Sequence, residues 1–331
     1  MLSFKTTCMK YNFAFSFITA FFACLGATAQ DSTHLLGTDS TLLLEEVIVQ
    51  AYHINSRLNR VPGSISVLSG DEIRVGDGNN FANTLHAVPG IYMHSGTYAT
   101  SRVVIRGVGS RTPYNTNRVK SYLNDIPITS SDGISAPEDI DLWGIGRIEV
   151  IKGPASALYG SGLGGNINLY TPSMDRNSLQ VSLQQGSYNT TKTAAGSSYR
   201  GADLGLWGNL SHVQSDGYRE NNQYKRTSLL SAGSWQQPAY TVEYTLLLID
   251  LEAGIPSSIG KTLYETDPRA AAANWNEVKG YKGYRRAIGG ITVANRISSR
   301  WDNRLTLFGR WADSHERRPF NNLDDGTSGG G

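Results

Sequence analysis

The chain has 331 residues, and its 30 lysines and arginines nearly balance its 28 aspartates and glutamates. That length is enough for two ordinary domains. Both cysteines, Cys8 and Cys24, precede residue 30, so the rest of the chain has no disulfide, no catalytic thiolate and no cysteine-ligated metal. With 36 glycines, 17 tyrosines and only 18% charged residues, the composition favours many short strands over coiled coil or long disorder.

Residues 1–29 have the pattern of a secretory signal peptide. Two lysines form a basic start, residues 11–26 are an uncharged and mostly apolar run, and Ala27-Thr28-Ala29 fits a cleavage site. The run is too short to favour a membrane-spanning helix, and the residues before Cys24 are a poor lipoprotein signal. The chain that remains after cleavage has 28 basic and 28 acidic residues, which gives no reason to expect nucleic acid as a partner.

Residues 57–172 combine short helices with short strands. Ser69-Gly70-Asp71-Glu72 is a capping box, which predicts that a helix begins there. Apolar spacing predicts a second helix over residues 81–88, before a Pro-Gly pair that would end it. Strand patterns occur at residues 102–106 and 147–150. We therefore expect an α+β domain here.

From residue 178 onward, apolar residues recur at every second position. In residues 240–248, every even-numbered residue is aromatic or aliphatic. Trp301 and Trp311 would lie on one face of another strand, ten residues apart, which at a tilt of roughly 40° is about 25 Å along a barrel axis. That is the height of the apolar band of an outer-membrane barrel, whereas the strands of a soluble β-sandwich, the alternative, are usually shorter.

The same pattern predicts seven strands whose connections alternate in length. The strands are expected near residues 179–186, 191–199, 204–213, 226–235, 240–249, 284–297 and 301–312. The connections at 200–203, 236–239 and 298–300 are tight, whereas those at 214–225 and 250–283 are long. Short turns on one side and long loops on the other are typical of outer-membrane barrels, with the short side in the periplasm.

Seven strands do not close a barrel around a domain as large as residues 57–172, because a plugged lumen needs about 22 strands. The chain ends in a polar, glycine-rich stretch that resembles the middle of an extracellular loop. The expected fold class is therefore an α+β plug domain followed by the first strands of an antiparallel transmembrane β-barrel. We expect the chain to be the N-terminal fragment of a longer protein.

Four segments carry a family resemblance. Residues 84–91, residues 104–107 and Arg147–Gly160 (RIEVIKGPASALYG) look like the plug motifs of TonB-dependent outer-membrane receptors, and residues 44–49 (LEEVIV) look like a TonB box. The last plug motif is long and specific. The sequence departs from the family at Asn124-Asp125-Ile126-Pro127, where Asp-Gly more often precedes the apolar residue and the proline.

The resemblance implies a siderophore-type receptor in the outer membrane of a Gram-negative bacterium, with a barrel of about 22 strands plugged by residues 57–172. Residues 30–56 would be a periplasmic extension, and residues 173–331 the truncated barrel part, in contact with outer-membrane lipid. The partner would be TonB with its inner-membrane energising complex, bound by Glu45, Glu46, Val47, Ile48 and Val49. Such a segment suits strand addition, although Val47–Val49 also fits an ordinary buried strand.

Charge placement hints at the ligand. Between Asp77 and Asp125 there is no acidic residue, but there are five basic ones, Arg102, Arg106, Arg111, Arg118 and Lys120. They would suit an anionic ferric chelate such as ferric citrate or a carboxylate siderophore, or they would pair with acidic residues of the barrel wall. We expect residues 109–117 to form an apical loop. The preferred ligand-binding candidates are Arg111, Tyr114, Asn115, Asn117 and Arg118. Residues 262–269 are similar to a loop of ferric-dicitrate-type receptors.

No pattern predicts an enzyme. Gly160–Gly165 matches G-x-G-x-x-G, but a strand pattern follows it where a dinucleotide site needs a helix. Gly254–Thr262 resembles a P-loop, yet it has five residues between its glycines where the motif has four. The six histidines show no metal-ligand spacing. We therefore expect no catalytic residue, no cofactor and no bound metal.

Three functions remain open from the sequence. The first is TonB-dependent import of a ferric siderophore or a ferric-citrate-like chelate. The second is TonB-dependent import of a glycan or peptide, which would usually add a carboxypeptidase-regulatory-like domain before the box, and residues 30–44 leave no room for one. The third is a secreted β-rich adhesin, which would need neither the box nor the plug motifs.

Overall fold

The computed structural model describes residues 48–50, 56–75, 78, 80–98, 100–111, 116–298 and 300–320. The chain divides into two compact units, Met1–Glu46 and Val47–Gly331, and every described residue belongs to the second. The expected signal peptide and residues 44–47 of the expected TonB box therefore lie outside the described residues. No helix in the described ranges is long and apolar enough to cross a membrane.

The α+β domain is built on a mixed five-stranded sheet of order β3-β8-β9-β6-β7. Its strands are β3 (Ser64–Ser69), β6 (Val119–Leu123), β7 (Ile126–Pro127), β8 (Arg147–Lys152) and β9 (Gly165–Tyr170). Strands β6 and β9 run parallel, and the other neighbouring pairs are antiparallel. Two-stranded sheets are formed by β1 (Ile48–Val49) with β2 (Ser56–Arg57) and by β4 (Ile91–Thr97) with β5 (Thr100–Ile105). All six residues of β9 are buried, so this strand is the centre of the domain.

Short helices connect these strands. They are α2 (Gly70–Val75), α3 (Phe81–His86), α4 (Ser156–Tyr159) and the 3-10 helices η2 (Leu58–Arg60), η3 (Pro137–Asp139) and η4 (Leu142–Gly144). At α2 the Ser69 N–H donates to Glu72 Oε2 at 2.7 Å and the Glu72 N–H donates to Ser69 Oγ at 3.3 Å, so the predicted capping box is confirmed. Helix α3 ends at His86, two residues earlier than the apolar spacing predicts, and Val88 is buried in the turn that follows.

The Gly160–Gly165 segment packs closely against β6. Gly164 N–H donates to the Arg118 carbonyl at 2.8 Å, so the segment runs directly beside β6. A Cβ on Gly162 would lie 3.1 Å from Cγ of Lys120 in β6, and one on Gly164 would lie 3.2 Å from a methyl of Val119 in the same strand. Gly162 and Gly164 are therefore explained by the contact between this segment and β6.

Substitution of Gly165 by Ala should strongly destabilise the domain. Gly165 has φ +139°, and a Cβ there would lie 2.1 Å from the backbone oxygen of Ile151 in the adjacent strand. We expect the free energy of unfolding to fall by about 2–5 kcal/mol, measured by chemical denaturation in detergent. Gly160→Ala is the control, because Gly160 also has positive φ but a Cβ there meets nothing within 4 Å. Equal effects of the two substitutions would contradict the packing argument.

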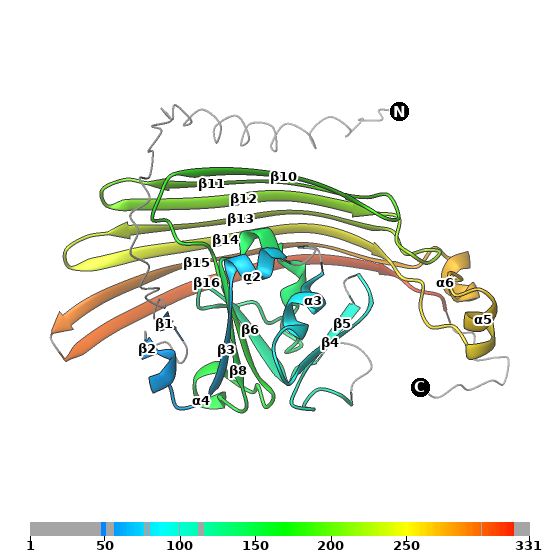
Figure 1. The fold of residues 1–331 in the computed structure, drawn as a ribbon, viewed down its shortest axis with the longest axis horizontal. Helices are drawn as coiled ribbons and strands as arrows, with labels where there is room; N and C mark the ends of the chain where they lie inside the picture. The colour runs from blue at the N-terminus through cyan, green and yellow to red at the C-terminus, as the bar shows by residue number, and fades with distance from the viewer. Residues whose placement is uncertain are drawn as a thin grey trace, which may run out of the picture. The chain divides into compact units, whose positions relative to one another are not determined.

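The second half of the described chain is one antiparallel sheet of seven strands in sequence order (Figure 1). They are β10 (Ser178–Gly186), β11 (Thr190–Arg200), β12 (Leu204–Ser215), β13 (Tyr224–Gln236), β14 (Tyr240–Gly254), β15 (Tyr281–Ser298) and β16 (Trp301–Arg317). Each predicted strand is present. The largest differences are at β14 and β16, which continue five residues beyond their predicted ends.

The two faces of the seven-stranded sheet differ as the alternation predicts. On one face Trp301 and Trp311 expose 71% and 57% of their surface, so this face carries its aromatic residues outward. On the other face Leu247 and Ile249 are buried in the same hydrophobic core as Ile145 of the α+β domain. The sheet therefore covers the α+β domain with its inner face.

Candidate functional site

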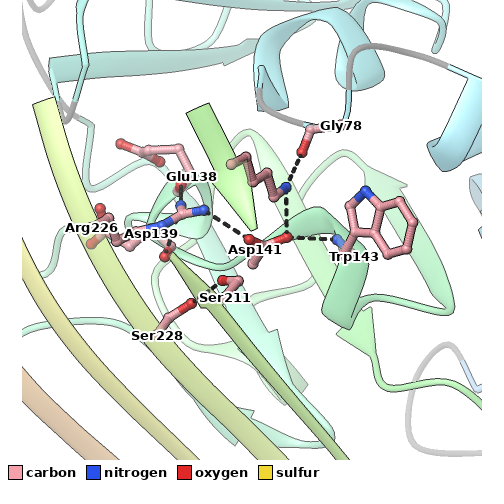
Figure 2. Close-up of polar contacts among 9 residues, drawn as sticks. Gly78, Glu138, Asp139, Asp141, Trp143, Ser211, Arg226 and Ser228 are labelled. Carbon is pink, nitrogen blue, oxygen red and sulfur yellow. Dashed lines mark hydrogen bonds and ion pairs between the residues drawn. The ribbon is translucent and has the colours of Figure 1, made fainter. Parts of the chain in front are cut away.

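Charged side chains of the seven-stranded sheet hold one loop of the α+β domain through buried ion pairs. Asp141 Oδ1 lies 2.9 Å from Lys192 Nζ, and its Oδ2 lies 3.3 Å from Arg226 Nη2 (Figure 2). Arg286 Nη1 lies 2.8 Å from Asp139 Oδ2. These five residues, Asp139, Asp141, Lys192, Arg226 and Arg286, are called the anchor cluster below.

Asp141 is the centre of the anchor cluster. Only 3% of its surface is exposed, and its Oδ1 also accepts a hydrogen bond from the Trp143 N–H at 2.8 Å, which caps η4. Burial alone would raise the pKa of Asp141, but the charges of Arg226 and Lys192 outweigh burial and lower it. The carboxylate is therefore ionised and satisfied, as a buried charge must be to be tolerated.

The cations of the cluster also bind backbone carbonyls of the α+β domain. Lys192 Nζ donates to the Gly78 carbonyl at 2.9 Å. Arg226 Nη1 donates to the carbonyls of Glu138 and Asp139 at 3.1 and 3.2 Å. Lys192 and Arg226 together therefore connect the segment after α2, the helix η3 and Asp141 to two strands of the sheet, β11 and β13.

Glu138 lies beside the cluster and has an unusual environment. Its Oε1 accepts a hydrogen bond from Ser101 Oγ at the start of β5, and its buried Oε2 has no hydrogen-bond partner within the described residues. Burial, followed by repulsion from Asp139, raises the pKa of Glu138 from 4.5 to about 7. Its carboxyl group therefore takes up a proton near neutral pH.

The raised pKa of Glu138 predicts a pH-dependent stability. Between pH 4.5 and about 7, the folded state holds a proton that the unfolded state has lost, so the contribution of Glu138 to stability is fully present below pH 4.5 and falls as pH rises through this window. We expect a loss of about 1–3 kcal/mol across the window, measured by thermal denaturation at pH 5 and pH 8. Glu138→Gln should remove this part of the dependence. An unchanged pH dependence in that variant would contradict the assignment.

The turn of the β4–β5 hairpin meets the seven-stranded sheet at the end where the long connections lie. Tyr98, in that turn, stacks on Tyr224, the first residue of β13, with ring centroids 4.3 Å apart. Tyr98 exposes 37% of its surface, whereas Tyr224 is buried. This stacking places Tyr98 of the α+β domain next to the connection that precedes β13.

The described end of the expected TonB box is a docked strand. Ile48 and Val49 pair with Arg57 and Ser56, and Val49 is fully buried against Ile151 and Tyr159. Gln50 N–H donates to Glu149 Oε1 at 3.0 Å. Among the described residues, β2 is the one strand that pairs with β1.

The predicted ligand-binding residues fall into two groups. Arg111, Asn117 and Arg118 are described and exposed, whereas Tyr114 and Asn115 lie outside the described residues. The structure does not test their role, so they stay a prediction. Of the other basic residues of this region, Lys120 is buried and donates to the Gly133 carbonyl at 2.9 Å, so Arg111 and Arg118 are better placed for a ligand.

Sequence reasoning missed the anchor cluster. The available signal was a basic residue on the inner face of an otherwise small or apolar strand, as with Lys192 beside Ala194 and Arg226 beside Ser228. In the described part of the chain, no group of three or more His, Cys, Asp or Glu side chains is arranged to hold a metal ion.

Comparison with known proteins relates the α+β domain to one family. The TonB-dependent Receptor Plug Domain family matches residues 57–166. Vitamin B12 transporter BtuB of Vibrio vulnificus is 34% identical over 147 residues, which is 43% of this chain and 23% of that protein. The iron-regulated outer membrane virulence protein of Vibrio cholerae is 32% identical over 143 residues, 42% of this chain and 22% of that protein. The chain thus spans about a quarter of the length of these relatives.

Solved structures share the fold over most of the chain. The unliganded ferric citrate transporter FecA superposes with a TM-score of 0.70 at 15% identity, covering 83% of this chain and 44% of FecA. The ferric yersiniabactin uptake receptor FyuA of Yersinia pestis gives a TM-score of 0.62 at 17% identity, covering 78% of this chain and 42% of FyuA. The α+β domain and the seven strands therefore have the arrangement of the matching parts of these receptors.

Proposed function

Because residues 57–166 are a TonB-dependent receptor plug domain, we propose that the chain acts as the N-terminal part of an outer-membrane receptor that imports a ferric chelate. One observation carries this proposal. The plug domain is held against the inner face of seven barrel-type strands by the anchor cluster, whose central pairs Asp141–Lys192 and Asp141–Arg226 are buried. A secreted adhesin would have no need for such a seated plug.

We further propose TonB as the energising partner. Residues 45–49 lie between the signal-type segment and the plug domain, and the described part of this stretch, Ile48–Val49, is already extended. An extended segment suits main-chain pairing with an added strand. Burial of Val49 against Ile151 and Tyr159 means that a pull on this strand acts directly on the plug domain.

A ferric siderophore or ferric-citrate-like chelate is the proposed ligand. The exposed Arg111 and Arg118 offer bidentate donors that suit carboxylates. Of the proteins that share the fold, FecA is a ferric citrate transporter and FyuA is a ferric yersiniabactin uptake receptor. A vitamin B12-type ligand is the second candidate, because BtuB of Vibrio vulnificus is 34% identical over the matched region.

The test is energised uptake by the complete receptor. Cells that express it should accumulate radiolabelled iron from ferric citrate or a carboxylate siderophore, and accumulation should fall to background in cells without TonB or with a protonophore. Radiolabelled cyanocobalamin is measured in parallel. Uptake of cyanocobalamin alone would replace the proposed ligand with the second candidate. Uptake that is independent of TonB would refute the energy coupling.

A further inference from the structure

Two connections at one end of the seven-stranded sheet are bonded to each other although strands β13 and β14 separate them. The first is residues 216–223, between β12 and β13. The second is residues 255–280, between β14 and β15, which includes α5 (Lys261–Thr266) and α6 (Ala273–Glu277). A long surface connection without such bonds is usually mobile. These two connections together are called the wall below.

Arg219 makes the central link of the wall. Its Nε and Nη2 donate to the Ala270 carbonyl at 3.1 and 2.7 Å, and its Nη1 donates to the Ser257 carbonyl at 2.7 Å. A guanidinium holds its donors in one rigid plane, so one side chain fixes two distant points of residues 255–280 relative to each other. Ala270 is buried beneath this contact.

Neighbouring residues of Arg219 hold the remainder of the second connection. Asn221 Nδ2 donates to the carbonyls of Ile255 and Gly280, the two ends of that connection, at 2.9 and 2.8 Å. Asn276 Nδ2, in α6, donates to Glu220 Oε2 at 2.9 Å. The ends of residues 255–280, as well as α6, are therefore tied to a single short segment.

The wall also continues into the plug domain. Asp216 N–H donates to the Tyr188 carbonyl at 2.9 Å, which joins the wall to the connection between β10 and β11. At the other end of the first connection, Tyr224 follows directly and stacks on Tyr98 of the plug hairpin. The wall thus lies next to the turn of the plug that would face a ligand.

We propose that Arg219 is a positioning residue that locks residues 216–223 and 255–280 into one wall before any ligand arrives. In the receptor function proposed above, on which the role of the ligand rests, the ligand then meets a preformed surface, and residues 255–280 do not close over it as a lid. The bonding of the wall is a property of the fold, so it can be tested without a ligand.

The first experiment is amide hydrogen exchange on the purified receptor without ligand. Arg219→Ala should speed exchange in residues 255–280 by about tenfold or more and leave β8 and β9 unchanged. The reason is that the substitution removes hydrogen bonds within the wall and none in the sheet of the plug domain. Arg219→Lys, which keeps the charge but not the planar donors, should give an intermediate rate. Arg285→Ala is the control, since Arg285 is an exposed arginine paired with Asp250. Wild-type exchange as fast as that of Arg219→Ala would overturn the proposal.

The second experiment cross-links the wall. Glu220 and Asn276 meet at their side-chain ends, 2.9 Å apart, so Glu220→Cys with Asn276→Cys places two thiols within reach of a short bismaleimide cross-linker. A preformed wall predicts that the reagent joins the thiols without ligand, and that the joined receptor binds and imports ferric citrate within about twofold of the untreated form. Failure to join, or a loss of about tenfold or more in ferric citrate binding upon joining, would overturn the proposal. If neither form binds ferric citrate, the proposed ligand is wrong. The exchange rates and the joining of the thiols still test whether the wall is preformed.

Discussion

Asp141→Asn should weaken the attachment of the plug domain to the barrel strands. The substitution keeps the size of the side chain but removes the charge that faces Lys192 and Arg226, which are 0% and 5% exposed. Removing one partner of a buried ion pair leaves an uncompensated buried charge, and the cost is about 3–5 kcal/mol. We expect proteolysis to cut the plug domain of the folded receptor much faster, while the barrel stays resistant.

The matched control for Asp141→Asn is Asp250→Asn. Asp250 also pairs with an arginine, Arg285, at 3.2 Å, but both partners are 63% exposed, so we expect a change of less than about 1 kcal/mol. Lys192→Met combined with Asp141→Asn should recover part of the lost stability, since it removes one of the two positive charges that Asp141→Asn leaves without a carboxylate partner. Equal protease resistance of Asp141→Asn and Asp250→Asn would show that the anchor cluster does not seat the plug.

The seven strands were predictable from the sequence because one face of each strand must be apolar. Alternation over residues 240–248 fixes which side chains point outward, and a shift of one residue would exchange the two faces. The start of α2 was equally local, since Ser69 and Glu72 bond each other across three positions. The ends of β14 and β16 were missed because the apolar alternation stops before the strands do: Asp250 and Glu252 occupy the outward positions of β14, and β16 continues through the polar residues 313–317.

The anchor cluster could not be predicted in the same way, because its partners are far apart in the sequence. Asp141 meets Lys192 51 positions later and Arg226 85 positions later. No local pattern states which inward-facing cation reaches which carboxylate, since that depends on how the plug lies against the sheet. The parallel pairing of β6 with β9 was unpredictable for the same reason, and the close contacts of Gly162 and Gly164 with β6 become clear only once that pairing is known.

The described residues of the expected TonB box fit both interpretations of its sequence, a segment for strand addition and an ordinary buried strand. Its described residues form a strand, as a pairing segment should, and Val49 is also fully buried, as an ordinary core residue would be. These are compatible, because strand addition uses main-chain groups whereas the burial at position 49 involves the side chain. A partner that paired with the main chain of β1 would therefore pull on the plug domain through the contacts of Val49 with Ile151 and Tyr159.

Ile48→Pro should stop uptake by the complete receptor and leave ligand binding at the cell surface within about twofold of wild type. Proline removes the N–H of residue 48 and fixes its φ, so an added strand loses a main-chain bond within the box. Val47→Pro, in the part of the box outside the described residues, should have the same effect. The measurements are accumulation of radiolabelled iron from the bound chelate and equilibrium binding to whole cells.

Ile48→Ala is the control for the proline substitution, because it shortens the side chain but keeps the N–H that strand addition needs. We expect Ile48→Ala to retain most uptake. Retained binding by Ile48→Pro separates a coupling defect from a misfolded plug, since a displaced plug would change the ligand surface as well. Normal uptake by Ile48→Pro and Val47→Pro would contradict the assignment of residues 45–49 as the TonB box, and the buried Val49 would then be no more than a core residue of the plug domain.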